Sequence, residues 1–326
     1  MPEAKNILIA VELHEQHAVP VLQWATLVAR RTNGRLTLLH VNESTAALPT
    51  RGEFASASGM APDAVERWRH HYETTTRAEL QHLLAQHCGG VPANVLLPEG
   101  RAPAVILGAI ESTQCDLVVM GTHGRPWYER ALIGSTAEAV LRASPTPVLI
   151  VHNTTAPPTP PQLSRILFPT DFSPTSGPGE EWTRFWVAHG VHDVRLVHTV
   201  ENPLLDLYHP DTVDIDMRRL MEESRQHPPR SAQPFWDHAH QLAHTKLSQL
   251  RHQLLSTAQG SSHIEIIVDE GPATDHILRV VTQSNPDLII MATHGRTGVP
   301  RFLLGSVTSK VVRAVSCPVL VVPHPQ

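Results

Sequence analysis

The chain has 326 residues, a formal net charge of −5 at pH 7, 41% hydrophobic residues and 17% charged residues. Its length is about twice that of a typical domain and its composition is that of a globular protein, so we expect two domains with separate cores. No apolar run approaches the roughly 20 residues that cross a bilayer, and no cluster of Lys and Arg offers a basic surface. The sequence therefore predicts neither a membrane nor a nucleic acid as a partner.

Three cysteines, Cys88, Cys115 and Cys317, occur without a Cys-x-x-Cys pair. Their number and spacing argue against a disulfide framework and favour a reducing compartment. The first five residues lead directly into a strand-like segment, without the layout of a signal peptide. We therefore expect a cytoplasmic protein.

The first half of the chain alternates short apolar runs with segments of helical periodicity. The apolar runs, rich in β-branched residues and leucine, predict strands at 6–11, 35–41, 93–97, 117–121 and 147–151. The intervening pattern predicts helices at 17–31, 62–87, 101–113 and 134–143. Strands that alternate with helices form a parallel, doubly wound α/β sheet, which binds ligands beyond the carboxyl ends of its strands.

The second half repeats the first. Residues 99–151 align without a gap with residues 270–322, at a constant offset of 171. The predicted organisation is a first domain at 1–152, a Pro-rich linker at 153–163, and a second domain at 164–326 with an insertion at about 202–236. The insertion suggests either a lid near the second site or a surface for a protein partner.

A glycine motif follows the fourth predicted strand in each half. The first half has Gly-x-x-Gly, nine further residues and Gly-Ser, and the second half has the same pattern with alanine at its first position. Closely spaced glycines let backbone N–H groups approach a phosphate, and the later Gly-Ser begins a helix whose dipole favours anions. Two copies with equal spacing, each between a strand and a helix, predict phosphate binding.

The motif and its flanking residues resemble the universal stress protein family in its tandem form. The resemblance extends to the Asp-Leu-Val-Val-Met and Asp-Leu-Ile-Ile-Met segments and to the Pro-Val-Leu endings of both halves. It implies two tandem doubly wound five-stranded parallel sheets of the adenine-nucleotide hydrolase type, packed as an intramolecular pseudo-dimer through the last strands. It also implies binding of ATP, or of AMP or ADP, with Mg²⁺ left open.

The resemblance further implies particular site residues. Adenosine would be held by Glu12 and Val41 in the first half, and by Asp171 and Thr199 in the second. In the first half, the phosphate-binding residues would be Gly121, His123, Gly124, Gly134, Ser135 and Thr136. In the second half, they would be Ala292, His294, Gly295, Arg296, Gly298, Gly305, Ser306, Val307 and Thr308.

The two halves depart differently from the family pattern. Glu12 stands where the family usually has the shorter aspartate, and Pro126 and Trp127 stand where small residues are frequent. The second half keeps Asp171 and replaces only the first motif glycine, by Ala292. We therefore expect the second half to be the better nucleotide site.

Other polar residues have structural interpretations. Asp116 and Asp287 are expected to start the fourth strands and cap a turn, and His40 and His198 to be hydrogen-bonded at the ends of the second strands. The 22 histidines include only one suggestive pair, His240 with His244, and no recognisable spacing completes a metal site. We expect no metal centre.

The sequence contains no catalytic constellation that we recognise. It lacks the Walker A lysine motif, a dinucleotide-binding Gly-x-Gly-x-x-Gly and a nucleophile elbow, so we expect at most slow ATP hydrolysis. The leading hypothesis is a nucleotide-responsive stress or signalling module with an unidentified protein partner. Two alternatives stay open: a scaffold with degenerate pockets, and a slow ATPase. Assembly of the pseudo-dimer into a further homodimer also stays open.

Overall fold

The computed structural model describes residues 2–13, 15–43, 62–122, 133–152, 161–200, 233–258, 260–293 and 304–324. These residues fall into two compact units. The first combines the chain up to Gln162 with the last residues from Ser316, and the second is drawn from the chain between Leu163 and Val315.

The first unit contains a sheet in the order β3-β2-β1-β4-β5-β10. Its strands are β1 (Asn6–Ala10), β2 (Arg35–Leu39), β3 (Ala93–Leu96), β4 (Leu117–Gly121), β5 (Val148–Val151) and β10 (Val319–Val322). Its helices are α1 (Glu15–Thr32), α4 (Pro62–His87), α5 (Ala102–Thr113) and α6 (Ser135–Ala143). Strands β1 to β5 pair in parallel, whereas β10 pairs antiparallel with β5.

The second unit has the strand order β9-β6-β7-β8, with parallel pairing. Its strands are β6 (Arg165–Pro169), β7 (Asp193–Val200), β8 (His263–Glu270) and β9 (Leu288–Ala292). Its helices are the short η1 (Pro174–Ser176), α7 (Gly177–Ala188), α9 (Gln233–Thr257), α10 (Ala273–Ser284) and α11 (Ser306–Ala314).

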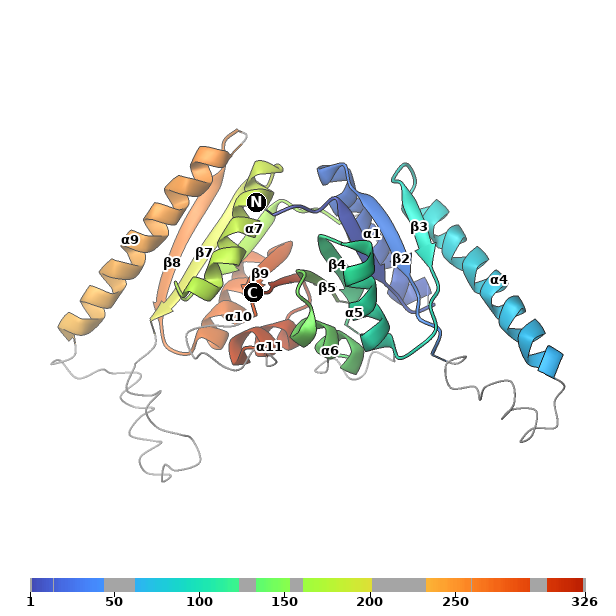
Figure 1. The fold of residues 1–326 in the computed structure, drawn as a ribbon. Coiled ribbons are helices and arrows are strands. Elements are labelled where there is room, and N and C mark those ends of the chain that lie inside the picture. The colour runs from blue at the N-terminus through green and yellow to red at the C-terminus, as the bar shows by residue number, and fades with distance from the viewer. Residues whose placement is uncertain are drawn as a thin grey trace, which may run out of the picture. The chain divides into compact units, whose positions relative to one another are not determined.

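Each half of the chain thus forms five strands, and the predicted doubly wound α/β fold is confirmed (Figure 1). The buried runs are continuous, as in β4 and β9, because helices pack on the sheet. Helices α1 and α4 pack together, as do α5 and α6; α7 and α9 form the corresponding pair in the second unit, as do α10 and α11. The last strand, β10, is grouped with the first unit through its pairing with β5.

The topology fixes where a ligand would bind. Strand β1 lies between β2 and β4, and β6 lies between β7 and β9, so the direction of winding changes beside β1 and β6. Ligands of doubly wound sheets bind at this switch point, beyond the carboxyl ends of the strands. The candidate sites are therefore at the ends of β1 and β4, and at the ends of β6 and β9.

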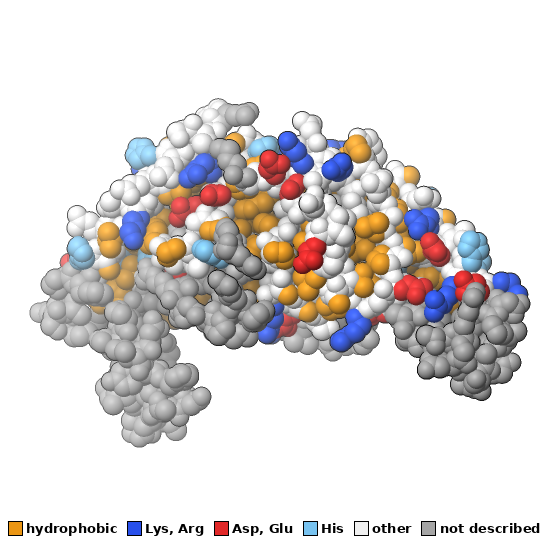
Figure 2. All heavy atoms as spheres, in the orientation of Figure 1, with side chains coloured by type: hydrophobic (Ala, Val, Ile, Leu, Met, Phe, Trp, Pro, Cys, Tyr) orange, Lys and Arg blue, Asp and Glu red, His pale blue; other side chains and the backbone are white. Residues whose placement is uncertain are grey.

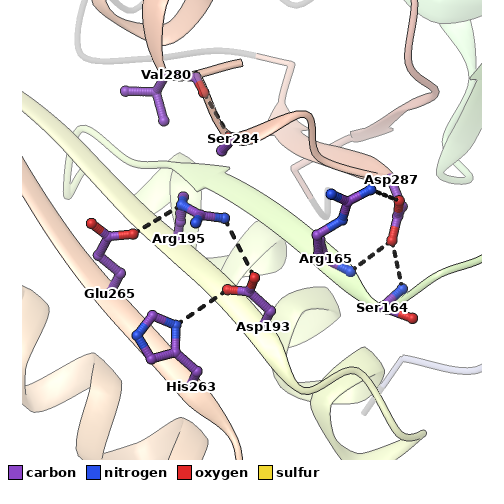
Figure 3. A network of polar contacts seen from close by, with 9 residues as sticks. All are labelled: Ser164, Arg165, Asp193, Arg195, His263, Glu265, Val280, Ser284 and Asp287. Carbon is purple, nitrogen blue, oxygen red and sulfur yellow. Dashed lines mark hydrogen bonds and ion pairs between the residues drawn. The ribbon is translucent and has the colours of Figure 1, made fainter. Parts of the chain in front are cut away.

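The opposite, amino-terminal end of each sheet is held by an aspartate. Asp287 Oδ2 accepts hydrogen bonds from the backbone N–H groups of Ser164 and Arg165, both at 2.9 Å, and Asp287 Oδ1 accepts a third from the Arg165 guanidinium (Figure 3). Asp116 Oδ2 likewise accepts from the backbone of Lys5 and Asn6. Both aspartates precede the fourth strand of their half, as predicted. Their hydrogen bonds also join that strand to the first strand.

Strands β7 and β8 carry a charged network at this same end (Figure 3). Arg195 Nε lies 2.9 Å from Glu265 Oε2, and Asp193 lies between Arg195 and His263. The pairs of Arg195 with Glu265 and of Asp193 with His263 join register partners on neighbouring strands, whereas Asp193 and Arg195 both lie on β7. The network stabilises the sheet far from its ligand-binding end.

Helix α9 begins at Gln233, so the last residues of the predicted insertion at about 202–236 lie in this helix. Residues 201–232 lie outside the described residues, as do the loops 123–132 and 294–303. Of the helices that the structure describes, none combines the length and the hydropathy that a membrane span requires.

Candidate functional site

The candidate site of the second unit lies where β6 and β9 end. Thr170 and Asp171 follow β6, and Thr293 follows the neighbouring strand β9. The N–H of Gly305 donates a hydrogen bond to the Thr293 carbonyl oxygen at 2.7 Å, which places the start of α11 at the same edge of the sheet. Gly305 caps α11, and the next residue, Ser306, is exposed. A solvent-accessible helix N-terminus at a switch point favours an anionic ligand.

The Asp171 carboxylate is held by its own turn. Its Oδ1 atom accepts hydrogen bonds from the backbone N–H of Ser173 at 3.0 Å, from the Ser173 hydroxyl at 2.6 Å and from the Ser176 hydroxyl at 2.5 Å. The bond to the backbone two residues further on is an Asx turn. Helix η1, which contains Ser176, packs against β9, so the turn lies between the two strands of the switch point.

Phe172, next to Asp171, has a left-handed backbone with φ of +59°. This conformation costs a bulky residue about 1–2 kcal/mol and needs compensation from its surroundings. The ring of Phe172 packs on the buried His198 with a centroid separation of 4.3 Å, and Lys246 Nζ of α9 lies 5.0 Å from the Phe172 centroid. His198 Nδ1 in turn lies 2.8 Å from the Thr170 carbonyl oxygen, in the hydrogen-bonded structural position that we expected.

A second polar cluster surrounds the end of β8. Thr199 of β7 is the register partner of Asp269 in β8, and Asp269 forms ion pairs with His276 and Arg279 of α10. The His276 Nδ1 and Asp269 Oδ2 atoms are 2.9 Å apart. These α10 side chains are not marked by any sequence motif; the parallel pairing of β7 with β8 places them beside the predicted adenosine contact.

The histidines of α9 separate in the structure. His240 Nε2 lies 2.8 Å from Glu270 Oε1 at the end of β8, while His244 is exposed. The sequence pattern alone missed this carboxylate partner, since Glu270 is thirty residues away. Among the described residues, no group of three or more His, Cys, Asp or Glu is arranged to hold a metal ion.

Two predicted phosphate-binding residues, Ala292 and Thr308, are hydrogen-bonded to each other. The buried Thr308 hydroxyl donates to the carbonyl oxygen of Ala292 at 2.7 Å, so its one hydrogen is already used in a bond within the protein. Ala292 is the last residue of β9, as Gly121 is the last residue of β4. Val307 follows Ser306 in the first turn of α11 and has no hydroxyl to offer.

The first unit repeats the backbone geometry with different side chains. The N–H of Gly134 donates to the Thr122 carbonyl oxygen at 2.7 Å, and Ser135 and Thr136 begin α6. Val41 follows β2 and is half-buried, but Glu12 after β1 is exposed. The first unit therefore contains the same helix N-terminus, but the acid that follows its first strand is exposed.

Charge further separates the two sites. The first turn of α6 carries Glu138, whose carboxylate pairs with Arg142 at 2.5 Å. At the aligned positions of α11 stand Ser309 and Arg313, and Lys310 replaces an alanine of the first half. Figure 2 shows basic and acidic side chains intermixed over the coloured part of the face in view.

Six predicted residues lie outside the described residues. They belong to the loops after β4 and β9, and they are His123, Gly124, His294, Gly295, Arg296 and Gly298. The described residues that the structure brings to the switch point of the second unit are Asp171, Ala292, Gly305, Ser306, Val307 and Thr308.

These features define a class of protein: two repeats of a doubly wound α/β fold, each with a Gly-Ser helix N-terminus at its switch point. A model of the Universal stress protein family matches residues 3–152 and 163–323. The chain therefore belongs to the universal stress protein family, with one family domain in each half.

Comparisons with individual proteins agree with this assignment. A universal stress protein of Methanocaldococcus jannaschii is 42% identical over 64 residues, which are 20% of this chain and 36% of that protein. One of Mycobacterium tuberculosis is 26% identical over 216 residues, or 64% of this chain and 62% of that protein. The chain thus spans less than two thirds of either relative.

The fold is also found in a solved structure of the same family. The crystal structure of a universal stress protein from Archaeoglobus fulgidus has a TM-score of 0.58 and 19% sequence identity, covering 99% of this chain and 97% of that chain. This similarity extends over both halves and supports the tandem fold.

Proposed function

We propose that this protein binds an adenine nucleotide, ATP or else AMP or ADP, at the switch point of its second unit. The observation that carries the proposal is the position of Asp171 beside the N-terminus of α11, at neighbouring strand ends. Asp171 and Thr199 would contact adenosine, and the N–H groups at Gly305 and Ser306 would bind phosphate. The family signature in the loop after β9 supports the same assignment.

The second unit is the better site on two physical grounds. Asp171 is already held in a turn by hydrogen bonds, whereas Glu12 is exposed. Binding at Asp171 therefore costs less side-chain conformational entropy than binding at Glu12. Its phosphate helix has no acid in the first turn, whereas Glu138 in α6 would repel a phosphate group. Both differences favour an anionic ligand in the second half.

The proposed activity is binding that alters a surface, with at most slow hydrolysis. Phosphoryl transfer needs a lysine or metal at the β- and γ-phosphates and a group that orients water, and the sequence has no Walker A motif to supply them. Any Mg²⁺ would reach the site with the nucleotide phosphates. The module would respond to nucleotide through the loops after β9 and β6, where a protein partner could read the change.

Equilibrium binding of ATP, ADP and AMP to the full chain tests this proposal. We expect one strong site per chain, and Asp171→Ala should weaken binding about tenfold or more through loss of a hydrogen bond to a charged group. Glu12→Ala is the matched control and should change the affinity little. Equal losses in both variants would mean that both halves bind, and no binding by the unmodified chain would favour the scaffold alternative.

A further inference from the structure

We propose that Ser176 is a positioning residue, which fixes the Asp171 carboxylate for recognition of an N–H or O–H donor on the nucleotide. This inference rests on the proposed nucleotide site and adds a residue to it. Ser176 lies in η1, five positions beyond Asp171, and its side chain is buried.

The contacts of Ser176 support this role. Its residue exposure is only 4%, and its hydroxyl lies 2.5 Å from Asp171 Oδ1. Ser173 gives the same oxygen two further donors, from its N–H at 3.0 Å and its hydroxyl at 2.6 Å. The Ser173 hydroxyl is also 2.7 Å from Thr175 Oγ1. Three donors converge on one carboxylate oxygen, which fixes the rotation of that side chain.

The backbone of the turn is fixed independently of these hydroxyls. The N–H of Phe172 donates to Thr170 Oγ1 at 3.1 Å, and the left-handed Phe172 is supported by His198 beneath its ring and by Lys246 near it. The turn would therefore keep its path if one hydroxyl were removed. Loss of the Ser176 hydroxyl should release the carboxylate rather than the loop.

The first half differs at the corresponding sequence positions, which provides an internal comparison. Counting from the acid after the first strand, the sequence places His14 and His17 where the second half has Ser173 and Ser176. A histidine does not offer the short hydroxyl donor that packs into a buried turn. At the corresponding positions after the exposed Glu12, the sequence therefore provides no serine hydroxyl to hold its carboxylate.

A fixed carboxylate discriminates between ligands by their donors. An oriented acceptor forms its hydrogen bond without first losing side-chain freedom, and it penalises a ligand that leaves it unpaired. Adenosine offers N–H and O–H donors to this acceptor, whereas inorganic triphosphate is a polyanion at neutral pH, which the carboxylate would repel. The role of Ser176 should therefore appear with adenosine and ATP and be absent with triphosphate.

The test compares Ser176→Ala with Ser176→Thr, which retains a hydroxyl, and with His17→Ala in the first half. Affinities for adenosine, ATP and inorganic triphosphate are measured by calorimetry. We expect Ser176→Ala to weaken adenosine and ATP binding by about tenfold each and to leave triphosphate unchanged. Ser176→Thr should restore binding, and His17→Ala should have no effect.

The outcomes separate this inference from the proposed function. If the unmodified chain binds neither adenosine nor ATP, the nucleotide site itself is wrong. If it binds both and Ser176→Ala binds them equally well, Ser176 has no positioning role. Thermal unfolding and the Ser173→Ala variant serve as further checks. A uniform loss for all three ligands, in step with a lower melting temperature in both variants, would assign Ser176 to the stability of the turn instead.

Discussion

Burial changes the acid–base behaviour of several side chains that lie outside the proposed site. It raises the pKa of the Cys115 thiol to about 11 and raises the pKa of the Cys88 thiol as well. Both thiols are buried and stay protonated at neutral pH, so they are poor nucleophiles. Burial also raises the pKa of the Glu180 carboxyl, an effect that nearby Arg184 partly opposes.

Glu180 lies in the first turn of α7 and should make stability depend on pH. Below about pH 4 its carboxyl is protonated in both the folded and the unfolded chain, so it has no effect there. As the pH rises, the unfolded chain ionises first, and the free energy of unfolding decreases until the folded group also ionises.

Replacing this carboxyl group should remove that penalty. We expect Glu180→Gln to raise the urea midpoint of unfolding at pH 7 and to have little effect near pH 4. The exposed neighbour provides the control, since Glu181→Gln should change neither value. An equal gain at both pH values would assign the effect to packing or to the helix dipole, and no gain at pH 7 would contradict the direction of the pKa change.

At the scale of elements, one aspartate in each unit joins the first and fourth strands at the amino-terminal end of the sheet. It accepts hydrogen bonds from backbone N–H groups at the start of the first strand. In the second unit, Asp287 also pairs with Arg165, at 2.9 Å between Oδ1 and Nη2. In the first unit, the Asp116 carboxylate accepts hydrogen bonds from the backbone N–H groups of Lys5 and Asn6. The same residue type thus joins β6 to β9 and β1 to β4.

The Asp287 carboxylate should contribute measurably to stability. Asp287→Asn replaces an acceptor for two backbone N–H groups and one guanidinium with an amide that is a weaker acceptor and adds a donor. Since hydrogen bonds to charged groups contribute about 1.5–3 kcal/mol each, we expect the free energy of unfolding to fall by about 2 kcal/mol or more. Denaturant unfolding measures this change.

Nucleotide affinity provides the control for this variant, because Asp287 lies at the opposite end of the sheet from the proposed site. Asp287→Asn should leave binding intact at temperatures where the protein is folded. A variant with unchanged stability would show that the three hydrogen bonds are offset by the cost of burying the carboxylate. A selective loss of nucleotide would show that the two ends of the sheet are coupled.

At the scale of the whole molecule, the last strand of the chain belongs to the first compact unit. Strand β10 pairs antiparallel with β5, and every residue of both strands is buried. Pairing covers an apolar strand edge that would otherwise favour aggregation. The intramolecular pseudo-dimer remains our prediction, and this pairing provides a way to test it.

Paired cysteines can report whether β5 and β10 meet within one chain. Leu149 and Leu320 are register partners, so Leu149→Cys with Leu320→Cys, in a chain without its native cysteines, should form a disulfide. The oxidised protein should migrate as a monomer on a non-reducing gel. Val148→Cys with Leu320→Cys is out of register, on opposite faces, and should react poorly. A cross-linked dimer would show that the strands pair between chains.

The sequence by itself determined the class of fold, because continuous apolar runs alternate with helical periodicity and both halves share one aligned pattern. It also indicated the family, since the glycine motif and its spacing are local features of the chain. Asp116 and Asp287 were recognisable as strand starts for the same reason. A local sequence pattern is enough to predict a feature whose geometry depends only on residues close together in the chain.

Only the tertiary structure decided which distant groups meet. The pairing of β10 with β5, the ion pair of His240 with Glu270, and the position of Lys246 near Phe172 depend on how strands, helices and turns pack. Residues in contact across strands or between a helix and a turn have no fixed separation in sequence, so periodicity and spacing carry no signal for them. Ser173 and Ser176 are close to Asp171 in sequence, but only the folded turn brings both hydroxyls to one oxygen of its carboxylate.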